Sequence, residues 1–154
     1  VVGRLLAKEL RMRYYDSDEL IEKKLHKSIN QIFSDHDEKY FRDIEEGIVL
    51  SLLDKKNCVI SLGGGSILSG LTRKSLVINS FTIYLKVDIE ILYERLKKSN
   101  KRPLINNENI KEKLIHLAQD RNKYYRKANL IINNSKNTEE VLNTIKVQLQ
   151  KYYE

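Results

Sequence analysis

The sequence predicts an α/β protein with three layers, in which helices flank both faces of a parallel sheet. Short β-branched runs alternate along the chain with longer stretches where apolar residues recur at helical spacing. This alternation is typical of parallel sheets covered by helices. The 154 residues contain no internal repeat and only one proline. We therefore expect a single domain over residues 1–154.

Each predicted strand is a short apolar or β-branched run. These runs cover residues 13–15, 58–62, 81–85 and 130–132. Cys58, the only cysteine, lies in the second run. We interpret it as a buried strand residue rather than a nucleophile, in a protein without an internal disulfide.

The predicted helices follow apolar residues at a spacing of three and four. They cover residues 2–11, 17 to about 55, 89–96, about 110–126, and 137 or 138 to the end. In the first helix one side is apolar, with Val2, Leu5, Leu6 and Leu10. Ser28 and Gln31 have the spacing of a capping box, and Asp88 can cap the helix after it.

Composition restricts the partners only broadly. The formal net charge of +7 favours anionic partners, but basic residues are scattered among acids without a stripe or block. We therefore expect no nucleic-acid partner. No apolar run approaches 18 residues, so we expect no membrane span, and we expect a cytoplasmic protein.

Two carboxylates follow the first predicted strand, where ligands of parallel sheets gather. Asp16 and Asp18 have one interpretation as caps of the next helix. If phosphate binds nearby, one carboxylate can instead help to hold hydrated Mg²⁺. The other can then accept a proton from an attacking hydroxyl or orient that hydroxyl.

Arg42 and a run of three glycines are further candidates. Arg42 has Glu38 and Glu46 four residues away on either side, which fits a surface ion-pair ladder. Alternatively, its guanidinium binds a substrate carboxylate through two parallel hydrogen bonds. The glycines at 63–65 follow a strand and favour close approach of the backbone to a ligand over a plain turn.

Arginines occur in two other notable places. Arg102 lies in a polar segment, residues 99–109, that we interpret as a lid loop, where an arginine can neutralise a transferring phosphoryl group. Arg121 is near the end of a helix, where a cation is also favoured by the helix dipole. His26, His36 and His116 show no metal-ligand spacing, and we interpret them as ordinary residues.

In combination these motifs resemble those of the shikimate kinases. The resemblance rests on five segments in the family's order: Asp16-x-Asp18, Phe41-Arg42-x-x-Glu45, Gly63-Gly64-Gly65, Arg102-Pro103-Leu104 and Arg121-x-x-x-Tyr125. It covers nearly the whole chain. It implies a P-loop kinase-like fold with a five-stranded parallel sheet, and an enzyme that transfers the γ-phosphate of ATP to the 3-hydroxyl of shikimate in aromatic amino-acid biosynthesis.

The resemblance also implies roles for individual residues. Shikimate would be bound within a helical region at about 17–47, together with the glycine run and one later arginine. The residues implied for shikimate are Asp18, Arg42, Gly63, Gly64, Gly65 and Arg121. Asp18 and Arg102 would be catalytic, Asp16 would lie near Mg²⁺, and Arg102 and Arg95 would contact ATP. Residues around 135–137 would complete the adenine pocket, and we expect a monomer.

One part of the family pattern is missing. The glycine-rich phosphate loop that ends in Gly-Lys-Ser/Thr would immediately precede Val1, after the first strand. Three explanations are open: a mobile loop outside the residues given, a shortened chain, or a natural remnant that binds shikimate without phosphorylating it. Because the chain opens with Val, we expect one of the first two. A kinase of the same fold acting on another small hydroxy acid is a further alternative.

Overall fold

A computed structural model describes residues 1–98 and 109–154 of the chain. These residues form two compact units. Unit 1 comprises Val1–Leu5 and Phe81–Glu154, and unit 2 comprises Leu6–Ser80. Arg102 and nearly all of the expected lid at 99–109 lie outside the described residues.

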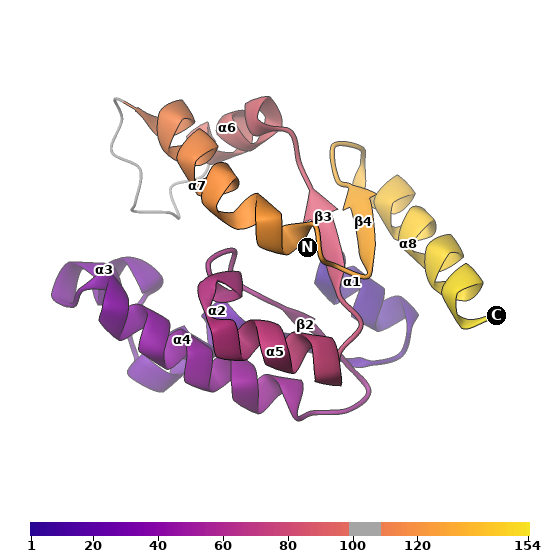
Figure 1. Ribbon diagram of the computed structural model, residues 1–154, viewed down its shortest axis with the longest axis horizontal. Helices are drawn as coiled ribbons and strands as arrows, with labels where there is room; N and C mark the ends of the chain where they lie inside the picture. Colours follow the sequence, from indigo (N-terminus) through magenta and orange to yellow (C-terminus); the bar gives the residue numbers. More distant parts are fainter. Residues whose placement is uncertain (99–108) are drawn as a thin grey trace. The chain divides into compact units, whose positions relative to one another are not determined.

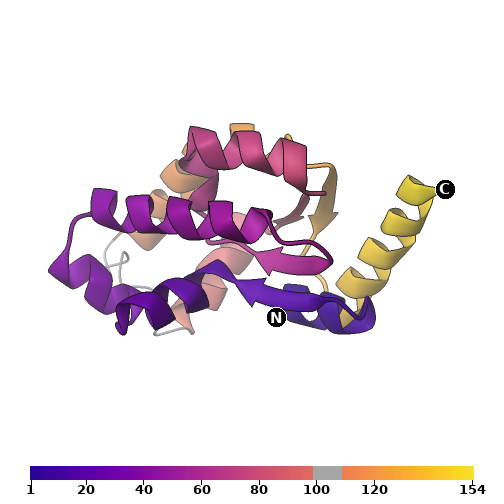
Figure 2. The same cartoon turned by 90° about the horizontal axis from the view of Figure 1, so that it is seen from below.

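Unit 2 begins within the first helix and contains the short strands β1 and β2. Its elements are the second half of α1 (Val2–Glu9), β1 (Arg13–Asp16), α2 (Ser17–Leu25), α3 (Ile29–Asp35), α4 (Glu38–Leu53), β2 (Cys58–Ser61), the 3₁₀ turn η1 (Ser66–Leu68) and α5 (Gly70–Asn79). The two strands pair in parallel, from Arg13 opposite Cys58 to Asp16 opposite Ser61 (Figure 2). Their carboxyl ends therefore meet at one edge.

The core of unit 2 is formed mainly by helices. Its largest buried cluster joins α2, α3 and α4 through Ile21, Ile32, Phe41, Ile48 and Leu52. A second cluster, Val49, Leu53 and Leu76, joins α4 to α5. Helix α4 thus contributes to both clusters, which fixes its position in the unit.

Unit 1 contains a second parallel pair of strands. Its remaining elements are β3 (Ile83–Lys86), α6 (Ile89–Lys97), α7 (Ile110–Tyr125), β4 (Leu130–Asn133) and α8 (Thr138–Tyr153). Strand β3 pairs with β4, and α8 lies beside β4 (Figure 1). Tyr84 of β3 stacks on Tyr125 of α7, with ring centroids 4.7 Å apart. Burial raises the pKa of the Tyr84 hydroxyl, and the neighbouring Tyr125 adds to the rise.

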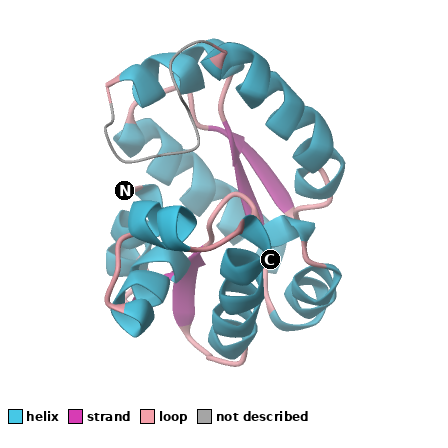
Figure 3. Ribbon diagram, turned by 90° about the vertical axis from the view of Figure 1, so that its left-hand side faces the viewer, coloured by secondary structure: helices cyan, strands magenta, loops and turns pink. Residues whose placement is uncertain are grey.

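Most predicted elements are confirmed within a few residues, and Figure 3 shows that helices make up most of the described chain. The capping box of Ser28 and Gln31 is present. The four described strands form two parallel pairs, so the parallel pairing is confirmed, although the resemblance implied five strands. Among the described residues, no helix is both long enough and apolar enough to cross a membrane.

Some details of the prediction were wrong. The first helix ends at Glu9 rather than at residue 11, so Leu10 lies outside it, and Val2, Leu6 and Ala7 form the buried side of α1. Asp88 stands at the start of α6, but its side chain accepts no capping hydrogen bond. Cys58 is half-buried rather than buried.

Thr72 offers a test of packing in unit 2. The residue is fully buried in α5, and its hydroxyl has no hydrogen-bond partner among the described residues. A buried unpaired hydroxyl is costly, whereas valine has the same shape without it. We expect Thr72→Val to raise the free energy of unfolding by up to about 1 kcal/mol in urea denaturation. A loss of more than about 1 kcal/mol would show that the hydroxyl is paired.

Candidate functional site

Asp16 lies at the edge where the carboxyl ends of β1 and β2 meet. It is the last residue of β1 and the N-cap of α2. Its Oδ1 accepts hydrogen bonds from the amides of Asp18 and Glu19, at 3.0 and 3.3 Å, and its Oδ2 accepts one from the Tyr14 hydroxyl at 3.2 Å. The capping interpretation is therefore confirmed for Asp16, and these bonds fix the direction in which α2 leaves the strand.

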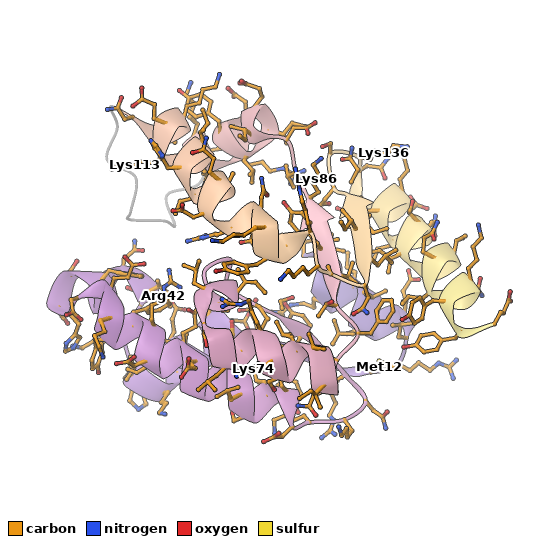
Figure 4. All side chains as sticks on the ribbon, in the orientation of Figure 1. Met12, Arg42, Lys74, Lys86, Lys113 and Lys136 are labelled. Carbon is orange, nitrogen blue, oxygen red and sulfur yellow. The ribbon has the colours of Figure 1, made fainter. Side chains whose placement is uncertain are left out.

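Arg42 lies on α4 (labelled in Figure 4) and is more buried than a surface ion-pair ladder would make it. Its side chain is only 22% exposed, and Nη1 donates to Oε2 of Glu45 at 2.6 Å. Its Nε and Nη2 both donate to Oε1 of Glu38, at the long distance of 3.4 Å. Glu46, the other partner expected for a ladder, instead accepts a hydrogen bond from Ser69.

Glu45 is the residue that the sequence interpretation overlooked. It is 2% exposed, and its two oxygens have different partners. Oε2 accepts from Arg42, and Oε1 accepts from the Ser66 hydroxyl at 2.8 Å. A buried carboxylate needs such partners, so Glu45 holds the guanidinium of Arg42 in place. The available signal was its place in the Phe41-Arg42-x-x-Glu45 segment, one helical turn after Arg42.

The glycine run follows β2, and Gly63 and Gly65 serve to make space. No glycine in the described chain has a positive φ, so backbone conformation does not require them. A Cβ on Gly63 would lie 2.8 Å from both Oδ1 of Asp18 and Oε1 of Glu45. A Cβ on Gly65 would overlap the guanidinium of Arg42. Glycine at these positions lets the backbone approach two carboxylates and one cation directly.

Unit 2 therefore brings together Asp18, Arg42 and the glycine run, as the sequence predicted. The first lies on α2, the second on α4 and the third after β2. A fixed guanidinium can bind an anionic group, while a carboxylate beside it can accept hydrogen bonds from hydroxyls. The arrangement suits a small polar ligand that carries both a negative charge and hydroxyl groups.

Two candidate arginines, Arg121 and Arg95, lie in unit 1 and have different neighbours. The Nε of Arg121 on α7 is buried and has no hydrogen-bond partner among the described residues. Arg95 on α6 donates from Nη2 to the carbonyl oxygen of Asn134 at 3.0 Å, beside the segment expected at the adenine pocket. In that segment the Ser135 hydroxyl is also buried and lacks a partner among the described residues. A buried polar group without a protein partner needs another one, such as a water or a bound ligand.

Mg²⁺ has one candidate contact in unit 2. The described residues contain no group of three or more metal-binding side chains. Mg²⁺ keeps most of its waters and is often bound through one or two carboxylates and the phosphates of a nucleotide. Asp16 fits a contact through water, because its carboxylate is held by three hydrogen bonds and retains acceptor capacity.

Comparison with known proteins gives a consistent result. A model of the family described as shikimate kinase matches residues 1–150. The chain is 36% identical over 153 residues to a shikimate kinase of Bartonella henselae, covering 99% of this chain and 73% of the relative. It is 39% identical over 131 residues to a shikimate kinase of Thermodesulfovibrio yellowstonii, covering 85% of this chain and 76% of the relative.

Solved structures agree with the sequence comparisons. The shikimate kinase of Acinetobacter baumannii in complex with shikimate superposes with a TM-score of 0.93 and 30% identity, covering 98% of this chain and 86% of that one. The shikimate kinase of Aquifex aeolicus gives a TM-score of 0.85 and 33% identity, with 99% and 89% covered. These similarities extend through both units.

The space at Gly65 can be tested by a double-mutant cycle with Arg42. Gly65→Ala should push the guanidinium away from buried Glu45 and lower the free energy of unfolding by about 2–4 kcal/mol. Arg42→Ala should have a similar cost, and the double variant should be no less stable than Arg42→Ala alone. Urea denaturation measures all three.

Gly47→Ala is the matched control, because a Cβ at this position in α4 meets nothing within 4 Å. It should be neutral or stabilise the protein by about 0.5–1 kcal/mol, as expected for alanine in a helix. Additive losses for Gly65→Ala and Arg42→Ala would contradict a clash between residues 65 and 42.

Proposed function

The chain belongs to the shikimate kinase family, and we propose that it transfers the γ-phosphate of ATP to the 3-hydroxyl of shikimate. Membership makes it an ATP-dependent phosphotransferase with an alcohol as acceptor. The observation that carries the proposed substrate is the cluster in unit 2, where Asp18 and Arg42 lie against the glycine run. Shikimate carries a carboxylate and three ring hydroxyls, which are the groups that an arginine and an aspartate bind.

Arg42 has one edge that suits the shikimate carboxylate. Its Nη1 is engaged by buried Glu45, whereas Nε and Nη2 donate only weakly, at 3.4 Å, to Glu38, whose side chain is 63% exposed. Nε and Nη2 together form an edge that binds a carboxylate through two parallel hydrogen bonds. We propose that shikimate takes this edge and displaces Glu38, while Glu45 keeps its bond.

Asp18 is proposed to contact the reacting hydroxyl. Phosphoryl transfer needs little covalent chemistry from the protein, so positioning and charge stabilisation supply most of the rate. Asp18 either accepts the proton of the attacking hydroxyl or orients that hydroxyl for in-line attack. The glycine run supports this role because Gly63 leaves the space beside the Asp18 carboxylate that a side chain would fill.

Mg²⁺ and the remaining residues complete the proposal. Bound Mg²⁺ would neutralise charge on the phosphates, and Asp16 would orient one of its waters. From the family's pattern we propose that Arg121 makes a second contact to the shikimate carboxylate and that Arg95 contacts adenine. The role of Arg102 and the lid at 99–109 stays a prediction.

We also propose a single kinase domain over residues 1–154, since the family match spans residues 1–150. The shikimate-binding helical region at about 17–47 would include α2, α3 and most of α4. A monomer in the cytoplasm, where ATP is available and the single cysteine stays reduced, is the simplest arrangement.

The full-length protein should release ADP only when shikimate is present, and Arg42→Lys should show how the substrate is bound. Lysine cannot form two parallel hydrogen bonds, so we expect shikimate affinity to fall by about 2 kcal/mol or more, with ATP affinity nearly unchanged. A coupled ADP-release assay measures both constants. Arg13→Lys is the control, because Arg13 lies at the opposite end of β1 and is exposed.

A change in shikimate affinity below about threefold (roughly 0.7 kcal/mol) would show that Arg42 does not bind the substrate. Binding without turnover would favour a shikimate-binding remnant. Turnover with a different hydroxy acid in preference to shikimate would favour a kinase of the same fold with another substrate.

Glu38→Gln should have the opposite effect on shikimate binding. If Glu38 occupies the edge of Arg42 that the substrate takes, removing its charge should tighten shikimate binding by about 0.3–0.5 kcal/mol, and less at high salt. Asp43→Asn on the same helix removes an equal charge that is paired with Lys39 instead. Equal changes in shikimate affinity for the two substitutions would mean that only the net charge matters. That outcome would argue against displacement of Glu38 by the substrate.

A further inference from the structure

Ser17 stands between the two aspartates but has no role in the site described so far. It is the first residue of α2 and is fully buried. Its Oγ accepts a hydrogen bond from the amide of Gly63 at 3.0 Å, across 46 residues of sequence. We propose that Ser17 is a positioning residue that fixes the glycine run against Asp18 and thereby sets the affinity for shikimate. This inference rests on the proposed function of the same site.

The bond from Gly63 to Ser17 extends the strand pairing of unit 2. The backbone ladder between β1 and β2 ends where Asp16 lies opposite Ser61. Just beyond that point the chain of Ser17 turns into α2, so its backbone no longer follows the strand. Its hydroxyl then takes the place of a backbone acceptor and keeps Gly63 attached to the start of α2.

Both polar backbone groups of Gly63 are fixed. Its amide donates to Ser17, and its carbonyl oxygen accepts from the amide of Ser66 at 3.0 Å. The hydroxyl of Ser66 donates to Glu45, which holds Arg42. A continuous set of hydrogen bonds thus connects Ser17, the neighbour of Asp18, to the guanidinium proposed to bind the substrate carboxylate.

The bond to Ser17 limits where the glycine run can lie. A Cβ at Gly63 would lie 2.8 Å from Oδ1 of Asp18, so the missing side chain is what lets this segment lie beside the carboxylate. Without the hydroxyl of residue 17, the partly buried amide of Gly63 would lose its acceptor. The glycine run would then shift to find another partner, because an amide that is shielded from water and left unpaired is costly. The distance between Asp18 and Arg42 would change with it.

The test compares two pairs of variants of the full-length protein that differ only in the hydroxyl of residue 17. The first pair is wild type and Ser17→Ala, and the second is Ser17→Thr and Ser17→Val, which have equal volumes. Within each pair, loss of the hydroxyl should raise the KM for shikimate by about tenfold, with the KM for ATP changed less than about twofold. Thr72→Val, which removes a different buried hydroxyl of unit 2, should leave both constants unchanged.

A second measurement does not depend on activity. Amide hydrogen exchange without ligands should show faster exchange of Gly63 in the variants that lack the hydroxyl than in their partners. The Thr and Val pair decides the matter if Ser17→Ala does not fold. Equal KM values for shikimate within the pairs, with unchanged exchange at Gly63, would overturn the proposal. Parallel changes in both KM values would also overturn it, because they indicate general destabilisation.

The proposed function and the role of Ser17 can be tested independently of each other. If wild-type protein released no ADP in response to shikimate, the substrate would be wrong. Faster exchange of the Gly63 amide in the hydroxyl-free variants would then still support the structural link between Ser17 and the glycine run, and unchanged exchange would defeat that link as well.

Discussion

The candidate site depends on one partly buried ion pair, between Arg42 and Glu45. Removing two charges from water is costly unless their geometry is good and their remaining hydrogen-bonding capacity is used. Here the second oxygen of Glu45 is satisfied by Ser66, and Gly65 leaves room for the guanidinium. The pair therefore constrains helix α4 together with the segment that follows β2 and contains η1.

This pair also explains why the glycine run is needed. Turn conformation does not require these glycines, since none in the described chain has a positive φ. Side chains at positions 63 and 65 would instead collide with Asp18, Glu45 or Arg42. Arg42 is thus held before any ligand arrives, which lowers the entropic cost of ordering it on binding.

The sequence predicted the elements of the fold, because local signals specify them, and it pointed to three of the positions that unit 2 brings together. β-branched runs and the capping box of Ser28 depend on neighbours in sequence, and they were interpreted correctly. The partners of Arg42 were not all predictable, since residues three and four positions away lie equally close on a helix. The bond between Ser17 and Gly63 spans 46 residues and follows only from the pairing of β1 with β2.

The charges around Arg42 have a consequence for how quickly a ligand reaches it. Glu38 and Glu45 both pair with this single guanidinium, and Asp18 lies with Glu45 beside Gly63, so carboxylates outnumber the cation locally. The whole chain, by contrast, carries +7. An anionic ligand is therefore drawn in by the distant positive field and meets opposing charge only at short range. Association should slow as ionic strength rises, because salt screens the distant attraction more than the interactions at contact.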